Sequence, residues 1–310
     1  MYEWVERRFD ISPLIAEAQR SINFALPSTL TRQNKSRLFW LGYPYYYAGA
    51  ITAFLAVLQG VTGLLLAFHY VPSAAGDPGV PTQAYLSVQN IMRTVPLGAL
   101  IRGIHQWGAN LLVAALVMHT FWAYFRSPYR MGREITWVLG ALLLGLALAY
   151  SFSGYLLPWD QRGYWAATIS TQIMRAIPLF GDTIAQVVLG GTTMSATTLS
   201  RMYFYHVSLL PAVAIVLVGI HLVLVVLQGV SEPEEVWKPR DREGKTQQGG
   251  PLFGPFFPHQ ITPVIVISLV TLGIVLLLGA YAVQWPGDPA NKFLTPQFIA
   301  PEWYFLWAYG

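Results

Sequence analysis

Four histidines fall into two pairs with nearly the same spacing. His105 and His119 lie 14 residues apart in one apolar run, and His206 and His221 lie 15 residues apart in another. An α-helix has about 3.6 residues per turn, so 14 residues return to the same face about 21 Å further along. Fifteen residues also return to nearly the same face, with a small rotation about the helix axis. Each run is therefore predicted to be a helix that presents two imidazoles on one face.

This arrangement predicts two bis-histidine metal sites at two depths. A polar imidazole in a lipid-spanning helix is costly, so it should face the interior of the bundle and have a partner. Haem iron takes axial histidines and fits two matched pairs better than zinc, which favours a compact tetrahedron. The alternative is that these are core histidines that bond to Ser or Thr on neighbouring helices. The repeated spacing favours haem.

The composition is that of a membrane protein. The 310 residues are 54% hydrophobic and only 11% charged, and they include 11 Trp and 17 Tyr, which collect at membrane interfaces. The chain has no cysteine, which excludes disulfides, iron–sulfur ligation and haem attachment through cysteine within it. The net charge of +4 is spread over loops and indicates no nucleic-acid surface. Two non-covalent haem b groups are therefore expected.

Five apolar stretches are each long enough to cross a membrane. They are 47–70, 103–125, 135–157, 203–228 and 264–285. The uncharged stretch 183–200 is rich in Gly, Thr and Ser and does not qualify, whereas 166–177 is predicted to be a short amphipathic helix on the outer surface, stopped by Pro178, Gly181 and Asp182. The predicted fold is an all-α, polytopic transmembrane bundle with a four-helix di-haem core, a fifth helix and the start of a sixth.

The same pattern divides the chain into four parts. Residues 1–46 form a cytoplasmic or interfacial N-terminal segment, for which a solvated tail is the alternative, and 47–228 form the di-haem four-helix domain. Residues 229–263 are charged and Gly-rich and are predicted to be a cytoplasmic linker. Residues 264–310 begin a C-terminal domain.

The distribution of Lys and Arg predicts the orientation. The N-terminal segment and the loops after the second and fourth spans carry 13 of these residues, and the other loops carry 6. The positive-inside rule then places the N-terminus in the cytoplasm. The second and fourth spans run in the same direction, which pairs His105 with His206 near the outer face and His119 with His221 near the inner face.

Glycines repeat the histidine spacing on the other two helices of the core. Gly49 and Gly63 lie in the first span, Gly140 and Gly154 lie in the third, and both pairs are 14 residues apart. Glycines at these depths leave room for a macrocycle, although glycine also promotes close helix packing in membranes. Gly63 and Gly154 are assigned to the outer haem, and Gly49 and Gly140 to the inner one.

Several motifs together identify a family. They are Thr62-Gly63 followed by Leu64–Tyr70 (LLLAFHY), Gly154–Trp159 (GYLLPW) with Asp160-Gln161, Thr198–Arg201 (TLSR) before His206, and Pro301–Tyr304 (PEWY). With these motifs the chain resembles the cytochrome b subunit of cytochrome bc1 and b6f complexes along nearly its whole length. The PEWY motif is close to diagnostic of that family.

The resemblance implies a subunit of a quinol:cytochrome c, or plastocyanin-type acceptor, oxidoreductase. Such a subunit oxidises quinol at the outer face and passes electrons across the membrane through two b haems to an inner quinone site, coupled to proton translocation. The implied partners are a Rieske iron–sulfur protein, a c-type or f-type cytochrome and a second copy of the chain in a homodimeric complex, and the implied location is a bacterial inner membrane.

The chain stops at Gly310, just inside the expected sixth helix. Either the remaining helices belong to a separate subunit or the sequence is a fragment. Two other functions are alternatives. One is the di-haem anchor of another quinone-linked dehydrogenase, which would lack PEWY. The other is a non-redox scaffold or transporter, although the inverted repeats and broken helices typical of transporters are not found here.

The resemblance also assigns individual residues. Arg102, three residues before His105, is similar to the arginine that pairs with a haem propionate. Tyr47 stands where b6 proteins carry the cysteine that holds an additional haem, which again predicts only two haems. Tyr155, on the exit of the third span, and Tyr304 of PEWY are assigned to the quinol-oxidation site.

Glu302 is predicted to accept a proton from quinol. It is the only carboxylate side chain after Asp288, and the aromatic residues that follow it make its surroundings apolar. Such burial raises a carboxyl pKa toward neutrality, where the group can both take and release a proton. The alternative is that Glu302 only caps the N-terminus of the helix that follows, because carboxylates favour that end of the dipole.

Overall fold

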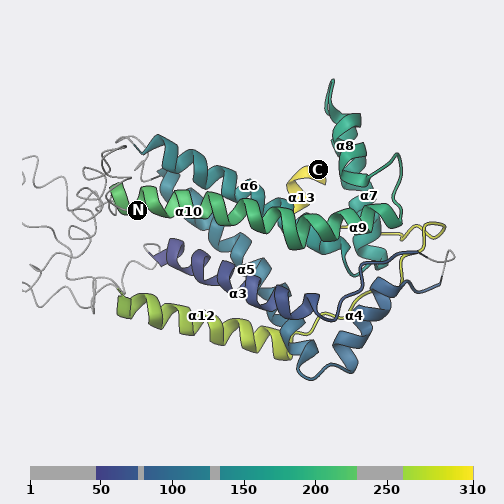
Figure 1. Ribbon diagram of the computed structural model, residues 1–310, viewed down its shortest axis with the longest axis horizontal. Helices are drawn as coiled ribbons and strands as arrows, with labels where there is room; N and C mark the ends of the chain where they lie inside the picture. Colours follow the sequence, from purple (N-terminus) through teal and green to yellow (C-terminus); the bar gives the residue numbers. More distant parts are fainter. Residues whose placement is uncertain (1–46, 76–79, 126–132, 229–260, 310) are drawn as a thin grey trace, which may run out of the picture. The chain divides into compact units, whose positions relative to one another are not determined.

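The computed structural model describes residues 47–75, 80–125, 133–228 and 261–309. The predicted N-terminal segment 1–46, and 229–260 of the predicted linker, lie outside these ranges. The described residues form helices, with a single isolated bridge between Asp160 and Pro289 (Figure 1). In chain order the helices are α3 (Ala48–Ala67), α4 (Gln83–Arg93), α5 (Gly98–Phe125), α6 (Glu134–Leu156), α7 (Gln161–Arg175), α8 (Gly181–Leu189), α9 (Ala196–Phe204), the π-helix η4 (Tyr205–Leu209), α10 (Leu210–Gln228), α12 (Ile261–Tyr281), the 3-10 helix η6 (Trp303–Phe305) and α13 (Leu306–Tyr309).

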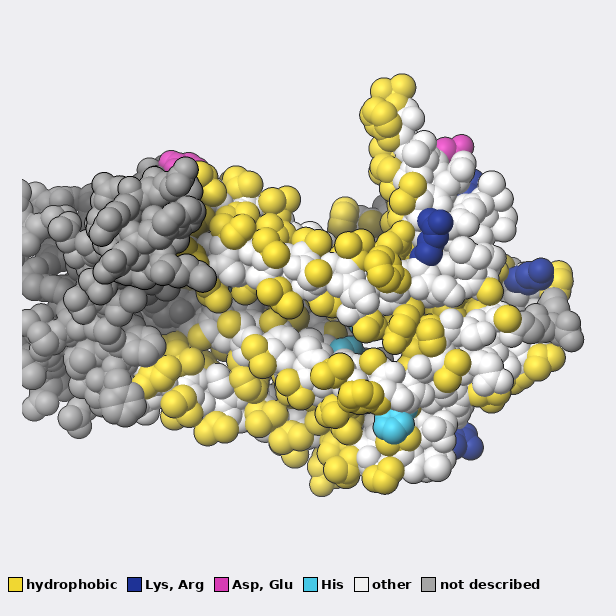
Figure 2. Space-filling view, viewed as in Figure 1, with side chains coloured by type: hydrophobic (Ala, Val, Ile, Leu, Met, Phe, Trp, Pro, Cys, Tyr) yellow, Lys and Arg dark blue, Asp and Glu magenta, His cyan; other side chains and the backbone are white. Residues whose placement is uncertain are grey.

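In this part of the chain five helical spans are long and apolar enough to cross a membrane. They are Ala48–Ala67, Gly98–Phe125, Glu134–Leu156, Ala196–Val225 and Ile261–Tyr281. Hydrophobic side chains cover most of the visible surface of these helices (Figure 2). Such surfaces are stable only against lipid or other apolar groups. The prediction of an all-α, multi-pass membrane protein is therefore confirmed.

The predicted limits of two spans were wrong. The second span begins at Gly98, five residues before the predicted start. The fourth begins at Ala196, before its predicted start at 203 and inside the stretch 183–200 that was not expected to span the membrane. The reason is local: Ser195 and Thr198 form a capping box that starts a helix at Ala196. That helix runs without interruption through η4 into α10.

The chain folds into two compact units, and each spanning helix contributes residues to both. Of the described residues, the first unit contains 47–52, 115–125, 133–143, 215–228 and 261–271. The second contains 53–114, 144–214 and 272–310. His119 and His221 belong to the first unit, whereas His105 and His206 belong to the second.

The second unit has a core at the ends of its spanning helices. Leu156 of α6 and Leu199 of α9 are fully buried there, against Trp159, Met202 and Ala84. Each buried leucine contributes about 1.5–3 kcal/mol relative to an exposed one. Ala84 comes from α4, an amphipathic helix that was not predicted and whose N-cap Thr82 accepts a hydrogen bond from the Tyr85 amide.

A second group of contacts ties the segment after α12 to the end of α6. One oxygen of Asp160 accepts the Gly163 amide at 2.9 Å, and the other accepts the Gly287 amide at 2.8 Å. The first bond caps α7, which explains why this helix begins at Gln161 rather than at 166. Gly181 and Asp182 were expected to stop this helix, but they begin α8.

The fifth span packs closely on the second. A Cβ atom on Gly103 of α5 would lie 2.6 Å from the carbonyl oxygen of Gly279 on α12. Small residues allow such close approach of helices in membranes. Trp107 reinforces this contact, because its indole donates to the Ala282 carbonyl at 2.9 Å.

Candidate functional site

The structure brings His105 of α5 and His206 of η4 together in the second unit. Their ring centroids are 6.2 Å apart and the ring planes are inclined by 77°. Bonds between a metal and an imidazole nitrogen are about 2 Å long, so two imidazoles on opposite sides of one ion have centroids about 6 Å apart. The pair therefore has the separation that a bis-histidine iron requires.

Hydrogen bonds orient both rings of this pair. Nδ1 of His105 lies 2.9 Å from the Thr62 hydroxyl, which itself donates to the Leu58 carbonyl at 2.7 Å. Nδ1 of His206 lies 3.1 Å from the Tyr150 carbonyl and 3.2 Å from the Ser153 hydroxyl. A carbonyl can only accept a hydrogen bond, and the Thr62 hydroxyl already donates its proton to the Leu58 carbonyl.

The tautomer of both rings follows from these bonds. Nδ1 carries the proton and donates it, so each Nε2 keeps a lone pair. This is the arrangement of metal-ligating histidines, in which one ring nitrogen donates to a fixed acceptor and the other binds the metal.

A π turn lies at His206. The segment Tyr205–Leu209 is a π-helix between α9 and α10. A π turn closes its hydrogen bond over one residue more than an α turn, and such turns are frequent at functional sites. It therefore takes up the extra residue in the 15-residue spacing from His206 to His221.

Glycines lie against both rings of the second unit. A Cβ atom on Gly63 of α3 would lie 3.1 Å from Cε1 of His105, and one on Gly154 of α6 would lie 2.6 Å from Cε1 of His206. The second distance is too short for any side chain. Because both residues are glycines, the edge of each imidazole lies where a Cβ would otherwise be. Gly63 and Gly154 thus form a cradle for the two rings.

The first unit repeats the arrangement with more space. A Cβ atom on Gly49 of α3 would lie 3.3 Å from Cε1 of His119, and one on Gly140 of α6 would lie 3.4 Å from Cε1 of His221. Nδ1 of His221 faces the backbone of Thr136 but has no hydrogen bond of normal geometry. All four predicted glycines thus lie beside a predicted ligand.

Three partners of the histidines were missed by the sequence reasoning. They are the Thr62 and Ser153 hydroxyls and the Tyr150 carbonyl. A signal for two of them was present, because Thr62 directly precedes Gly63 and Ser153 directly precedes Gly154. No such signal marks a backbone carbonyl.

The Arg102 guanidinium lies one turn before His105 on α5. One of its nitrogens donates to the Gln284 carbonyl and lies 3.6 Å from the Met92 sulfur. The adjacent Gln106 amide donates to the Gln284 side chain at 2.5 Å. The segment after α12 therefore holds Arg102 near the His105–His206 pair.

The PEWY residues are fixed by α5. The Trp303 indole donates to the Asn110 side chain at 2.8 Å, and Tyr304 is buried. Glu302 occupies the N-cap position of η6 but makes no capping hydrogen bond with its side chain. The observation disfavours the alternative in which Glu302 serves only as a cap.

The electrostatic surroundings of Glu302 suit a proton carrier. Burial raises the pKa of its half-buried carboxyl, and the Arg162 guanidinium opposes that shift. Burial raises the pKa of the Tyr304 hydroxyl, and the charge of the nearby Glu302 raises it further. The Glu302 carboxylate also interacts electrostatically with Tyr155. The three residues predicted for the quinol site therefore lie within electrostatic reach of one another.

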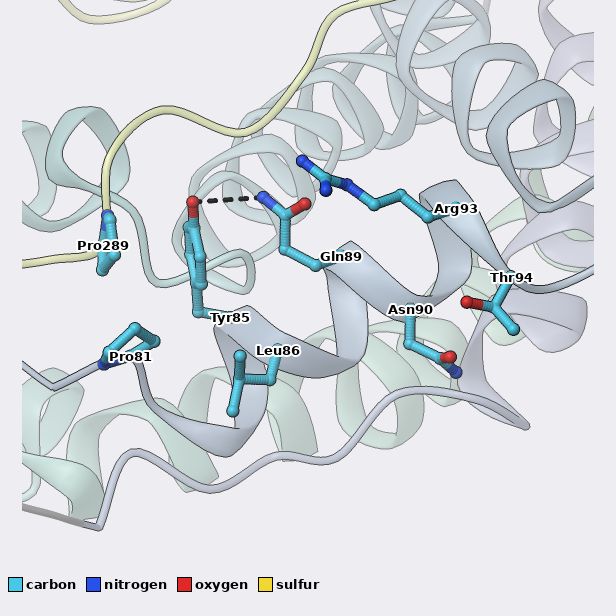
Figure 3. A pocket seen from close by; sticks show the side chains of 8 residues that line it. All are labelled: Pro81, Tyr85, Leu86, Gln89, Asn90, Arg93, Thr94 and Pro289. Carbon is cyan, nitrogen blue, oxygen red and sulfur yellow. Dashed lines mark hydrogen bonds between the residues drawn. The ribbon is translucent and has the colours of Figure 1, made fainter.

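A separate open groove of about 510 Å³ lies on α4. Tyr85, Gln89 and Arg93 line one side of it and Pro289 lines the other, and the Gln89 amide donates to the Tyr85 hydroxyl at 3.1 Å (Figure 3). None of the predicted site residues lines this groove.

Comparison with known proteins decides the family. Residues 41–229 match the family described as cytochrome b/b6/petB, and residues 289–310 match its C-terminal counterpart, cytochrome b(C-terminal)/b6/petD. The chain belongs to the cytochrome b/b6 family.

Individual relatives agree with this assignment. The chain is 34% identical to cytochrome b of Cereibacter sphaeroides over 98% of its own length, but it spans only 64% of that protein. It is 33% identical to cytochrome b6 of a Synechococcus strain, over 75% of this chain and 98% of the relative. A hyperthermophilic respiratory complex III chain has a similar structure, with a TM-score of 0.74 and 27% identity, over 99% of this chain and 75% of that one.

Proposed function

We propose that this cytochrome b/b6 family member is the di-haem subunit of a quinol-oxidising complex, which oxidises quinol at the outer face and reduces quinone at the inner face. The observation that carries the proposal is that His105 and His206 face each other with a glycine beside each ring, and that Nδ1 of each ring is bonded elsewhere. When bound, haem b supplies a one-electron redox centre at each pair, and these centres connect the two faces.

The family membership favours this function over the two alternatives, a dehydrogenase anchor and a transporter. His105 with His206 would hold the outer haem, and His119 with His221 the inner one. Gly63 and Gly154 would border the outer haem, Gly49 and Gly140 the inner one. Arg102 would neutralise a propionate of the outer group, a role supported by its position one turn before His105.

The protein's own groups would manage the protons of quinol oxidation. Each quinol releases two protons, and the Glu302 carboxylate is the base that would accept one. Its raised pKa allows the same group to release the proton to water. Tyr155 and Tyr304 would orient the quinol hydroxyl, since both hydroxyls lie within reach of the Glu302 charge.

The function implies further components. A Rieske iron–sulfur protein would take one electron, a c-type or f-type cytochrome would follow it, and the complex would be a homodimer. We place the protein in a bacterial inner membrane with the N-terminus in the cytoplasm, because Lys and Arg are concentrated in the loops on that side.

Spectra and turnover of the purified complex test this proposal. Reduction with quinol should produce the α-band of haem b, and quinol should reduce a c-type acceptor only when the Rieske protein is present. A haem b band without quinol oxidation would indicate the anchor of another dehydrogenase. The absence of any haem band would reject the proposal.

A further inference from the structure

The Asn110 side chain on α5 is held in one orientation by two hydrogen bonds. Its Nδ2 donates to the Gln106 carbonyl at 3.0 Å, one turn earlier on the same helix. Its Oδ1 accepts the Trp303 indole N–H at 2.8 Å. An indole nitrogen can only donate and a carbonyl can only accept, so exchanging the two ends of the amide would break both bonds. Asn110 therefore presents a fixed acceptor to the PEWY segment, Pro301–Tyr304.

Trp303 begins a helical element that is too short to hold its own direction. It is the first residue of η6, a single 3-10 turn that leads into the four residues of α13. Helices of this length are not stable alone, because the first turn fixes several residues in return for one hydrogen bond. Trp303 is itself 47% exposed. The direction of η6 therefore depends on contacts with the spanning helices, and the bond of Trp303 to Asn110 is such a contact.

The bond at Trp303 also sets the rotation of η6. A 3-10 helix has three residues per turn, so successive side chains point about 120° apart. The rings of Trp303 and Tyr304 have centroids 5.3 Å apart and are inclined by 78°. While Trp303 is directed at α5, Tyr304 is buried, and its hydroxyl lies beside the Ser151 side chain of α6. Rotation of η6 by one residue would remove the Tyr304 ring from this position.

Glu302 directly precedes η6 and follows its rotation. The Glu302 carbonyl accepts the Phe305 amide at 2.9 Å, which joins its backbone to this turn. The Glu302 side chain makes no capping hydrogen bond that would hold it independently. The direction of the carboxylate therefore depends on the backbone of η6, and through it on the bond between Trp303 and Asn110.

We propose that Asn110 is a positioning residue, which acts through Trp303 to hold Glu302 and Tyr304 at the quinol-oxidation site. Asn110 lies on the helix that carries His105, five residues and about 7.5 Å further along. One rigid helix thus fixes both the predicted haem ligand and the PEWY segment. The inference rests on the proposed function, because it concerns how that site is assembled. Asn110 takes no part in the proton transfer itself.

Three substitutions in the complete complex test this role. Asn110→Leu removes the acceptor with little change in side-chain size, and Trp303→Phe removes the donor but keeps an aromatic ring. Trp107→Phe is the matched control, because that indole also forms one hydrogen bond from α5, at 2.9 Å, but to the Ala282 carbonyl. The haem spectrum, the KM for quinol and the turnover per haem over a pH series are measured for each variant.

Asn110→Leu and Trp303→Phe should each retain both haems and lower quinol turnover by about 10- to 100-fold, as a small misplacement of a reacting group does. Both should also lose much of the rise in rate with pH that Glu302 produces. The double variant should be little slower than either single one, because both changes break the same bond. Adding Asn110→Leu to Glu302→Gln should lower turnover by less than about twofold, since the carboxylate is already absent. Trp107→Phe should keep the wild-type kinetics.

Wild-type turnover and pH profile in Asn110→Leu and Trp303→Phe would overturn the inference. Additive losses in the double variant, or an equal loss in Trp107→Phe, would also overturn it, because either would indicate a general effect on α5. If Asn110→Leu does not retain its haems, Trp303→Phe decides, since it breaks the same bond from the other side. Unchanged turnover in Glu302→Gln alone is a separate failure, which would contradict the proposed role of Glu302.

Discussion

The two histidine pairs are built alike but are held differently. In the second unit, Nδ1 of each ring has a partner, and a Cβ on Gly154 would lie only 2.6 Å from His206. In the first unit, Nδ1 of His221 has no bond of normal geometry, and a Cβ on Gly140 would lie 3.4 Å from that ring. The two rings of the second unit therefore have Nδ1 partners at normal hydrogen-bond distances, and a glycine lies closer to each of them than Gly140 lies to His221.

The sequence already contains the origin of this difference. Both glycines of the second unit follow a hydroxyl residue, Thr62 or Ser153, whereas Gly49 and Gly140 follow Ala48 and Leu139. The second unit also contains Glu302 and Tyr304. One helical repeat can thus provide two ligand pairs, while single side chains set how firmly each pair is held.

The largest effect should come from removing a ligand. His206→Leu should abolish the haem of the second unit and leave that of the first, and His221→Leu should do the opposite, because each haem has its own pair. Haem content and the reduced-minus-oxidised spectrum of each purified variant measure this. Retention of both haems in His206→Leu would break the pairing.

A carboxyl substitution should show that the second unit handles the protons of quinol oxidation. Glu302→Gln should retain both haems but lower the rate of quinol oxidation by about 100-fold or more, because it removes a proton acceptor. In the wild type the rate should rise with pH through the raised pKa of Glu302, since only the ionised form can accept a proton. Turnover per haem over a pH series measures both effects.

The control for this substitution is Asp288→Asn, which removes the preceding carboxylate in the chain. This variant should keep the wild-type pH profile. An unchanged pH profile in Glu302→Gln would refute the assignment of Glu302 as the proton acceptor.

Adding one methyl group to each unit should distinguish the two cradles. Gly154→Ala forces a Cβ against His206 and should destabilise the second unit by about 1–3 kcal/mol, the usual cost of overpacking. Gly140→Ala meets only ordinary van der Waals contact with His221 and should be nearly neutral. Thermal loss of each haem band measures this difference. Equal effects of the two substitutions would show that the cradles do not differ.

The smallest effect should come from a hydroxyl group. Thr62→Val removes the acceptor for Nδ1 of His105 and should weaken haem binding there by about 10- to 100-fold, as is typical for such partners of metal ligands. Thr52→Val is the matched control, since the Thr52 hydroxyl donates only to the Gly49 carbonyl on the same helix. Haem transfer to apomyoglobin measures retention. Equal loss from both variants would indicate a general effect on α3.

Much of this architecture could be predicted because it repeats. A helix returns to the same face after 14 residues, so the spacing of the histidines and of the glycines predicts which side chains meet. The apolar runs predicted the spans, apart from the start of the fourth, where Thr, Ser and Arg201 concealed α9 within a polar stretch.

The remaining features depend on contacts between distant segments. The bonds of Asp160 to Gly287 and of Arg102 to Gln284 join residues more than a hundred positions apart, and no local pattern indicates them. The π-helix at Tyr205–Leu209 left only a faint trace, the spacing of 15 instead of 14. Helix α4 is short and only weakly apolar, so its burial against α6 and α9 was not evident.

The ligand set itself is the central claim, and low-temperature electron paramagnetic resonance of the oxidised complex tests it most directly. Two low-spin ferric haem signals are expected, one for each histidine pair. The signal that depends on the His105–His206 pair would be that of the second unit. This signal alone should vanish in His206→Leu. A predominantly high-spin signal in the wild type would mean that an axial histidine is absent and would contradict the account.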